Sequence, residues 1–184
     1  LDAEQEPNGS AGTATALSSS SVALTGNIDS GSDADFFSFN AAAGDRLYAA
    51  TTTSSSSASG DTTLEVRSAS LGSIELDDQD GVFGDNASSL AGTVLSNAGA
   101  YNLVVRQNGA SAPIRPYHLY AHVRSGAPTA ESEPNDTSQA LPGSGWVSGS
   151  MSSATDVDTF TVTLAAGETV FASLDADPER DNLS

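Results

Sequence analysis

Two short acidic segments of the chain carry the residue types of a calcium site. Glu4–Asn8 has the sequence Glu-Gln-Glu-Pro-Asn, and Glu131–Asn135 repeats it as Glu-Ser-Glu-Pro-Asn. In an extended segment residues i and i+2 face the same way, about 7 Å apart, so Glu4 and Glu6 present two carboxylates to one point. Asn8 offers a third hard oxygen. Calcium takes about six to eight oxygens from separate segments, so this segment supplies only part of a site.

The alternative is that these acids are solvated turn residues in a very acidic protein. The chain has 24 acidic residues against 6 basic ones, a net charge of −18. This excess of negative charge attracts cations and repels nucleic acid and anionic membranes, so neither nucleic acid nor an anionic membrane is an expected partner. The chain has no cysteine, which excludes disulfides and thiolate metal sites. It also has no run of about 18 apolar residues, so no membrane span is expected.

Further blocks recur in the same order after each acidic segment, which indicates two copies of one structural unit. This recurrence favours the calcium interpretation, because the acids return at matched places. The paired blocks are Gly26–Ile28 with Gly149–Met151, Asp33–Phe39 with Asp156–Val162, and Ala42–Asp45 with Ala165–Glu168.

Apolar residues in the paired blocks alternate with polar ones, as in half-buried strands. Turn-forming Gly, Asn, Asp and Ser clusters separate these runs, and no stretch has a helical pattern. We therefore expect an all-β, antiparallel β-sandwich or jelly roll. The positions apolar in both copies, and so expected inside, are Phe37 with Phe160, Phe39 with Val162, Ala41 with Leu164, and Leu47 with Val170.

The repeat predicts one complete unit and part of a second. The first would span residues 1–124, and residues 125–130 form a short Gly/Pro-containing linker. The second would span residues 131–184 and lacks a counterpart to residues 65–124, so we expect a fragment of a longer protein. Half a sandwich leaves a hydrophobic sheet face uncovered.

Six motifs in this order resemble the bacterial pre-peptidase C-terminal domain, over the whole first unit and the first half of the second. The resemblance implies a jelly-roll β-sandwich in secreted or cell-surface proteins, attached to a protease or other hydrolase. The related collagen-binding domains of clostridial collagenases share this plan and bind calcium, so the resemblance also implies a calcium-binding, non-catalytic role, which we expect to lie in stability, export or domain spacing. The motifs are Glu4–Asn8, Ser32–Phe39, Ala43–Asp45, Asp61–Val66, Asp77–Gly81 and Ala98–Tyr101.

The same resemblance implies the remaining calcium ligands, from the loop before the Asp-x-Asp strand. In the first copy these are Thr25, Asp29 or Ser30, and Asp33. The corresponding set in the second copy is Glu131, Glu133, Asn135, Asp136, Ser148 and Asp156. We expect Asp35 and Asp158 to begin strands rather than to contact the ion. Calcium would tie each acidic segment to the following loop.

His118 and His122 stand four residues apart, a spacing that suits zinc on a helix but separates them by about 13 Å on a strand. The run around them alternates strictly, which predicts a strand with both histidines and Tyr120 on its outer face. These three residues are the candidate ligand-binding stripe of an alternative function, adhesion to an extracellular polymer or carbohydrate. The other interpretation of the stripe is a half-covered sheet surface.

Nothing in the sequence indicates catalysis. There is no Gly-x-Ser-x-Gly turn and no Gly-rich phosphate loop, so we expect no enzyme activity. Asp77–Gly81 resembles the start of an EF-hand, but Ser88 stands where the final glutamate belongs and no helix flanks it. A hairpin turn is the better interpretation of that segment.

Overall fold

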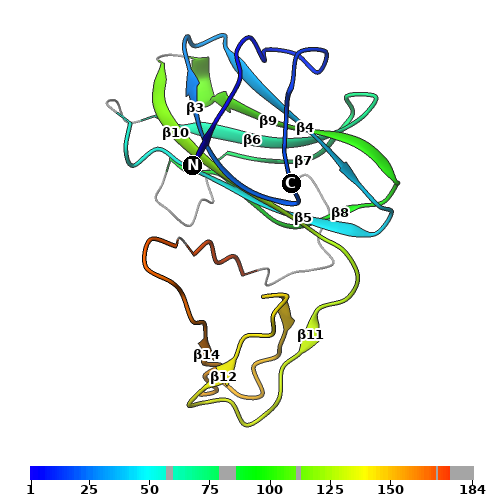
Figure 1. The fold of residues 1–184 in the computed structure, drawn as a ribbon, viewed down its shortest axis with the longest axis vertical. Coiled ribbons are helices and arrows are strands. Elements are labelled where there is room, and N and C mark those ends of the chain that lie inside the picture. The colour runs from blue at the N-terminus through cyan, green and yellow to red at the C-terminus, as the bar shows by residue number, and fades with distance from the viewer. Residues whose placement is uncertain (57–59, 79–85, 111–112, 169, 175–184) are drawn as a thin grey trace. The chain divides into compact units, whose positions relative to one another are not determined.

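The computed structural model describes residues 1–56, 60–78, 86–110, 113–168 and 170–174. The chain divides into two units, Leu1–Ser125 and Gly126–Phe171, and of the described residues 172–174 also belong to the first. The first unit holds two five-stranded sheets (Figure 1). Among the described residues, one short 3₁₀ turn at Asn108–Ala110 is the only helical element, and no helix is long and apolar enough to span a membrane.

The first sheet has the strand order β1-β3-β10-β5-β8. Its long strands pair antiparallel, and β1 pairs parallel with β3 at the edge. The strands are β1 (Asp2–Ala3), β3 (Ser21–Ile28), β10 (Ile114–Arg124), β5 (Asp45–Thr52) and β8 (Ser89–Leu95).

The second sheet has the order β2-β4-β9-β6-β7. Here too the long strands are antiparallel and the short edge strand β2 runs parallel to β4. Both sheets are therefore mixed, where the sequence predicted antiparallel pairing throughout. The strands are β2 (Thr15–Ala16), β4 (Ala34–Ala41), β9 (Gly99–Gln107), β6 (Thr62–Ser68) and β7 (Ser73–Asp77).

The core lies between the sheets and confirms the all-β sandwich expected from the alternating pattern. Phe37 and Leu103 of the second sheet and Leu47, Ala49 and Leu119 of the first are fully buried in one hydrophobic cluster. Leu47 and Leu119 alternate with more exposed neighbours, because successive side chains of a strand point to opposite faces.

The N-terminal leader, residues 1–17, connects the edges of the two sheets. Its start forms β1 against β3, and its end forms β2 against β4. The acidic segment lies between these two pairings. The leader therefore crosses the open side of the sandwich, where its side chains can reach strands of both sheets.

The second unit has little regular structure among its described residues. Four two-residue strands form two parallel pairs: β11 (Thr129–Ala130) with β13 (Val147–Ser148), and β12 (Gln139–Ala140) with β14 (Phe160–Thr161). The prediction that its repeated apolar positions lie inside is wrong for three of them. Val162, Leu164 and Val170 are about half exposed, because the described part of this unit provides no facing sheet to cover them.

Candidate metal centre

Three carboxylates of the first unit converge beside the leader. Glu4 and Glu6 come from the leader, and Asp35 comes from β4. Each offers an oxygen within 4.8 Å of the others. Asp35 shares the inward parity of Phe37 and is fully buried, whereas Glu6 is exposed. The cluster is thus buried on the side of Asp35 and open to solvent on the side of Glu6.

Main-chain hydrogen bonds fix Glu4 in this position. Its amide donates to the carbonyl of Thr25 at 3.1 Å, which continues the pairing of β1 with β3. The amide of Asn27 donates to Glu4 Oε1 at 2.6 Å. Both partners belong to β3, so the carboxylate of Glu4 is held at the edge of the first sheet.

Asn8 connects the leader to the second sheet. Its carbonyl accepts a hydrogen bond from the amide of Phe36 at 3.0 Å. Its side-chain Nδ2 donates to Glu4 Oε2 at 3.3 Å, and its own amide donates to Glu6 Oε2 at 2.8 Å. Asn8 is fully buried, so its Oδ1 is shielded from bulk solvent.

Tyr117 of β10 reaches the cluster from the opposite sheet. Its hydroxyl donates to Asp35 Oδ2 at 2.6 Å and lies 3.3 Å from Glu4 Oε2. Burial raises the pKa of Tyr117, as do the two carboxylates, so the hydroxyl keeps its proton and remains a donor. A side chain from the first sheet thus orients the carboxylates of the leader and of β4.

A glycine makes room for this arrangement. A Cβ on Gly26 of β3 would lie 2.3 Å from the ring carbon Cζ and the hydroxyl of Tyr117, and 2.7 Å from Glu4 Oε2. Contacts of that length do not occur between non-bonded atoms, so any larger residue would displace Tyr117 or Glu4. The glycine that opens the second repeated block therefore has a steric role at the cluster.

Burial makes the cluster electrostatically unfavourable without a cation. It raises the pKa of Asp35 to about 9, with the charge of Glu4 adding to the rise and the Tyr117 hydrogen bond opposing it. Burial likewise raises the pKa of Glu4. The ion pairs found among the described residues join Arg67 and Arg106 to Glu65, and Arg115 to Asp29; none reaches the cluster.

Two buried oxygens of the cluster have no hydrogen-bond partner, namely Oδ1 of Asn8 and Oδ1 of Asp35. A buried acceptor left without a partner costs about 1–3 kcal/mol, and more when it is charged. Carboxylate and amide oxygens are the ligands that calcium prefers, and the three carboxylates with an amide oxygen match that chemistry. The residues present therefore fit a hard divalent cation.

The other ligands expected in the first copy have different partners. Both carboxylate oxygens of Asp33 bind main-chain amides, those of Asp29 at 2.7 Å and Ala34 at 2.9 Å. The carboxylate of Asp29 pairs with Arg115 at 2.8 Å. Thr25 Oγ1 contacts His118 Nδ1 at 3.2 Å, and Ser30 contacts Ser32. The structure brings Asp35, and not Asp33, together with Glu4 and Glu6.

Asp35 lies at the start of a strand, as expected, and Asp158 stands two residues before β14, but both also belong to the carboxylate clusters and so become candidate ligands. Asp35 is the second residue of β4, but its parity turns it inward with Phe37. That parity was readable from the sequence, since an aspartate two residues before a core phenylalanine must also face inward. Tyr117 carried no comparable signal in the sequence.

The second unit repeats the cluster with Glu131, Glu133 and Asp158, again within 4.8 Å of one another. The amide of Glu131 donates to the carbonyl of Ser148 at 2.9 Å, and the amide of Ser150 donates to Glu131 Oε1 at 2.5 Å. These bonds match those of Glu4 with β3 in the first unit. Two of the expected ligands, Ser148 and Glu131, are thereby adjacent.

Asn135 repeats the role of Asn8. Its Nδ2 donates to Glu131 Oε2 at 3.3 Å, and its carbonyl accepts from the amide of Thr159 at 3.2 Å. Oδ1 of Asn135 and Oδ1 of Asp158 are again buried without a hydrogen-bond partner. The carboxylate of Asp156 binds the amides of Ser152 and Val157, as Asp33 does in its own loop.

Two differences separate the copies. Asp158 is partly exposed where Asp35 is fully buried, and no tyrosine hydroxyl contacts it within the described part of the second unit. Asp136, expected as a ligand there, is exposed, and its carbonyl accepts from the hydroxyl of Thr159.

The histidine stripe has strand geometry, as the alternation predicted. His118, Tyr120 and His122 lie at alternate positions of β10. Both ring nitrogens of His118 contact protein hydroxyls, Thr25 Oγ1 at 3.2 Å and Ser55 Oγ at 2.8 Å. His118 is therefore held by the fold. The Asp77–Gly81 turn lies partly outside the described residues, and its interpretation stays a prediction.

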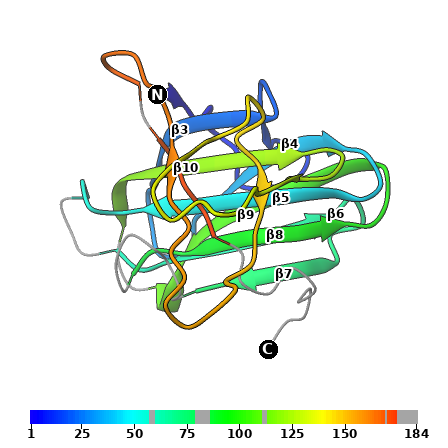
Figure 2. The same cartoon turned by 90° about the horizontal axis from the view of Figure 1, so that it is seen from below.

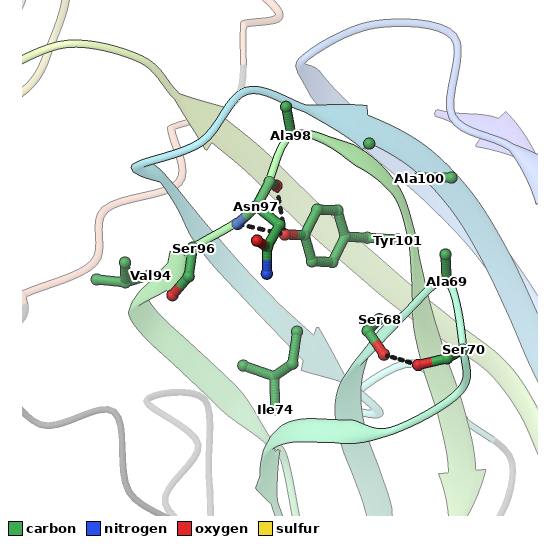
Figure 3. A pocket seen from close by; sticks show the side chains of 11 residues that line it. Ser68, Ala69, Ser70, Ile74, Val94, Ser96, Asn97, Ala98, Ala100 and Tyr101 are labelled. Atoms are coloured by element: carbon green, nitrogen blue, oxygen red, sulfur yellow. Dashed lines mark hydrogen bonds between the residues drawn. The ribbon is translucent and has the colours of Figure 1, made fainter.

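A cavity of about 390 Å³ opens at one end of the sandwich, between the β6–β7 and β8–β9 hairpins (Figure 3). Tyr101 forms one wall, and its hydroxyl donates to the carbonyl of Asn97 at 2.6 Å. Serines, alanines and the side chains of Ile74 and Val94 make up much of the rest. The described lining holds no Asp, Glu, His, Lys or Arg side chain.

Comparison with known proteins yields structural likenesses only. No family model matches the chain, and no curated protein matches its sequence. Aeromonas hydrophila PliG, a periplasmic inhibitor of g-type lysozyme, is similar at 19% identity and a TM-score of 0.45, over 60% of this chain and 96% of that one. The pre-peptidase C-terminal domain of Bacillus anthracis collagenase is similar at 15% identity and a TM-score of 0.41, over 60% and 94%. Salmonella Typhimurium PliG gives 14% identity and a TM-score of 0.41, over 60% and 97%. At these identities and TM-scores the likenesses carry no conclusion about function.

Proposed function

We propose that this chain is a non-catalytic, calcium-binding accessory module of a secreted or cell-surface bacterial protein. The observation that carries the proposal is the Glu4, Glu6 and Asp35 cluster, together with the partnerless buried oxygens of Asn8 and Asp35. An acidic cluster alone is common on acidic proteins. Buried acceptors without donors are rarer, because each costs stability unless a ligand satisfies it, and among the described residues four of the five such side-chain acceptors belong to the two clusters, Asp61 Oδ1 being the other.

Calcium at this position would fasten the leader to the sandwich. Glu4 and Glu6 belong to the leader, Asp35 belongs to the second sheet, and Tyr117 braces both from the first sheet. Calcium supplies the positive charge that these carboxylates lack. Because the ion would bind the folded state alone, it would stabilise that state by about 2.7 kcal/mol at a hundredfold excess over Kd.

A location outside the cell is part of this proposal, and a weak calcium site would suit it. Extracellular calcium modules work with dissociation constants of about 10⁻⁴–10⁻³ M, because calcium is abundant there. The cluster's three carboxylates are few for a tight site. A module of this kind would serve stability, export or the spacing of an attached catalytic domain, such as a protease or another hydrolase.

The experiment is a thermal melt of the full chain with calcium, with magnesium and with a chelator. Calcium should raise the melting temperature, and magnesium should do so much less, because it needs a stricter octahedral shell. Glu6→Gln keeps the shape of an exposed side chain and removes one ligand charge, so it should blunt the response. Asp2→Asn, an exposed acid of the same leader outside the cluster, is the control. Equal melts with calcium and chelator would reject the site.

A second candidate function is adhesion to an extracellular polymer. Tyr120 is favoured for this role because its cross-strand neighbours are both alanines, Ala23 on β3 and Ala50 on β5. The small side chains of these alanines leave room beside the tyrosine ring. Sedimentation with insoluble collagen, chitin and cellulose, comparing the wild type with Tyr120→Ala, tests this function independently of calcium.

A further inference from the structure

The second unit has almost no buried side chain among its described residues. In the stretches 126–168 and 170–171 only Asn135 is buried, at 1% exposure, and it is polar. Figure 2 shows the long strands β3, β10, β5 and β8 of the first unit side by side, whereas the described part of the second unit, coloured yellow to orange, has only very short strands. Burial of apolar surface is the dominant favourable term in folding. The described part of this unit is therefore not held together by a hydrophobic core.

Hydrogen bonds instead join three stretches of the second unit at its acidic segment. The amide of Glu131 donates to the carbonyl of Ser148 at 2.9 Å, and the amide of Thr159 donates to the carbonyl of Asn135 at 3.2 Å. The amide of Ser150 donates to the carboxylate of Glu131 at 2.5 Å. Three stretches that are separated along the chain therefore meet at the acidic cluster of this unit.

A glycine permits the closest of these approaches. A Cβ on Gly149 would overlap the carboxylate of Glu131, just as a Cβ on Gly26 would overlap that of Glu4 in the first unit. The chain beside this carboxylate can come so close only because the residue there has no side chain. The second unit is thus packed around a carboxylate, where the first is packed around apolar side chains.

The point where these stretches meet carries charge of one sign. Glu131, Glu133 and Asp158 each have a carboxylate oxygen within 4.8 Å of the others. Residues 126–171 contain six acidic residues and no lysine, arginine or histidine. Carboxylates this close repel one another, and no basic side chain of the same residues offsets them. A bound cation would convert that repulsion into attraction at the point where the stretches meet.

Two buried oxygens indicate where such a cation would bind. Oδ1 of Asn135 and Oδ1 of Asp158 are buried and have no hydrogen-bond partner. Nδ2 of Asn135 donates to Glu131 Oε2 at 3.3 Å, so this side chain lies at the cluster. Carboxylate and amide oxygens are the ligands that calcium prefers. The one buried side chain in the described part of this unit is therefore also a candidate calcium ligand.

We infer that calcium takes the place of a hydrophobic core in the second unit, which is ordered when the ion is bound and loses its order when the ion is removed. The first unit has its own core and stays folded in both conditions. Small metal-binding domains behave in this way because the free energy of metal binding is also free energy of folding. The inference rests on the proposed calcium-binding function and adds its regulation, since calcium switches the second unit alone.

The aromatic residues of the chain allow the two units to be followed separately. Trp146 is the only tryptophan, and its carbonyl accepts from the amide of Thr129 at 3.0 Å, next to the acidic segment. The four tyrosines all belong to residues 1–125. Tryptophan emission therefore reports on the second unit, and the near-ultraviolet circular dichroism of the tyrosines reports on the first.

The test titrates calcium into the full chain after treatment with a chelator. Trp146 should emit like a solvent-exposed tryptophan without calcium, and its emission should shift to the blue and saturate as calcium is added. Glu133→Gln should raise the calcium concentration at the midpoint about tenfold or more, because calcium affinity depends on the charge of the ligands. Glu133→Asp keeps the charge and should respond at an intermediate concentration, which shows that a chain altered at this position still folds.

Two matched controls carry the same substitution at other glutamates. Glu168→Gln removes an exposed acid of the second unit, whose carboxylate accepts from the amide of Ala165 in its own turn. Glu6→Gln removes a carboxylate of the first cluster. Both variants should leave the Trp146 midpoint unchanged. An equal shift in Glu168→Gln would assign the response to total charge and overturn the inference.

The separate signals distinguish failure of this inference from failure of the proposed function. A Trp146 response that Glu133→Gln weakens, with the tyrosine signal intact in chelator, supports both. Constant Trp146 emission, together with a melting temperature that calcium still raises, overturns the inference and keeps the calcium-binding function. Loss of both signals in chelator overturns the inference, because the two units then unfold as one. If neither the emission nor the melting temperature responds to calcium, both are overturned.

Discussion

The hydroxyl of Tyr117 lies 2.6 Å from the carboxylate of Asp35, although the two residues belong to different sheets and stand 82 positions apart in the chain. Both are buried, so the bond forms inside the sandwich and not at its surface. Glu4 of the leader shares the same hydroxyl at 3.3 Å. One phenol therefore links the leader and both sheets at the proposed calcium site.

Tyr117→Phe removes this hydroxyl and leaves the ring. We expect a loss of about 1–3 kcal/mol in the free energy of unfolding, because a buried carboxylate loses its donor. We also expect calcium affinity to fall by about tenfold or more, as when outer-shell partners of metal ligands are removed. Denaturant unfolding and calorimetric calcium titration measure the two effects.

The control for that variant is Tyr101→Phe. Its hydroxyl also makes a hydrogen bond, to the main chain of Asn97, but far along the sandwich from the cluster. The control should lower stability and leave the calcium dissociation constant unchanged. If Tyr117→Phe likewise altered only stability, Tyr117 would be a core residue with no part in positioning the ligands.

The raised pKa of Asp35 predicts how calcium-free stability depends on pH. Its folded value of about 9 lies above the ordinary 3.8, so between these values the folded state holds a proton that the unfolded state has released. Stability that is complete near pH 4 is then lost progressively as the pH rises towards 9. Chelator-treated protein should melt at falling temperatures over this window.

Calcium should reverse that trend, because it replaces the proton and binds more tightly as the pH rises. The gain in melting temperature on adding calcium should accordingly be larger at pH 8 than at pH 5, by an amount about proportional to the lost stability. Asp35→Asn should flatten the calcium-free pH dependence. A slope that persists in this variant would assign the titration to other groups.

The sequence was sufficient for the sandwich and for part of the site. Alternation placed Phe37 and Leu47 inside, because burial of one strand face is a local property. The sequence also places Glu4, Glu6 and Asn8 close together, because they share one short segment. Asp33 was expected at the ion from a resemblance, but its oxygens are used by the main chain of its own loop.

The remainder depends on contacts that no local pattern specifies. Which inward residue of β10 meets Asp35 is set by how the two sheets stack, and so Tyr117 was not predictable. The exposure of Val162 in the second unit has a similar origin. Val162 corresponds to the buried Phe39 in the repeat, but burial also requires a facing sheet, and the described part of that unit has none.

Gly26→Ala tests the steric argument at the cluster. The added methyl would lie 2.3 Å from Tyr117 and 2.7 Å from Glu4 Oε2, so one of them must move. Overpacking of this kind costs about 1–3 kcal/mol, and displacement of Glu4 should weaken calcium binding as well. Gly12→Ala is the matched control in the leader, because its nearest atom would be 4.0 Å away. If the two variants had equal stability and equal calcium affinity, Gly26 would have no steric role at the cluster.

The two clusters should differ in calcium affinity, and this difference tests what the sandwich adds to the acidic segment. Both have two glutamates, an aspartate and a buried asparagine oxygen without a partner. Only the first has a fully buried aspartate braced by Tyr117, and side chains already held in the binding geometry bind an ion more tightly because less order must be imposed on binding. Calorimetry should resolve a tighter and a weaker site. Glu6→Gln should weaken the tighter one and its isosteric counterpart Glu133→Gln the weaker one, so two sites of equal affinity would show that the acidic segment suffices without the tyrosine.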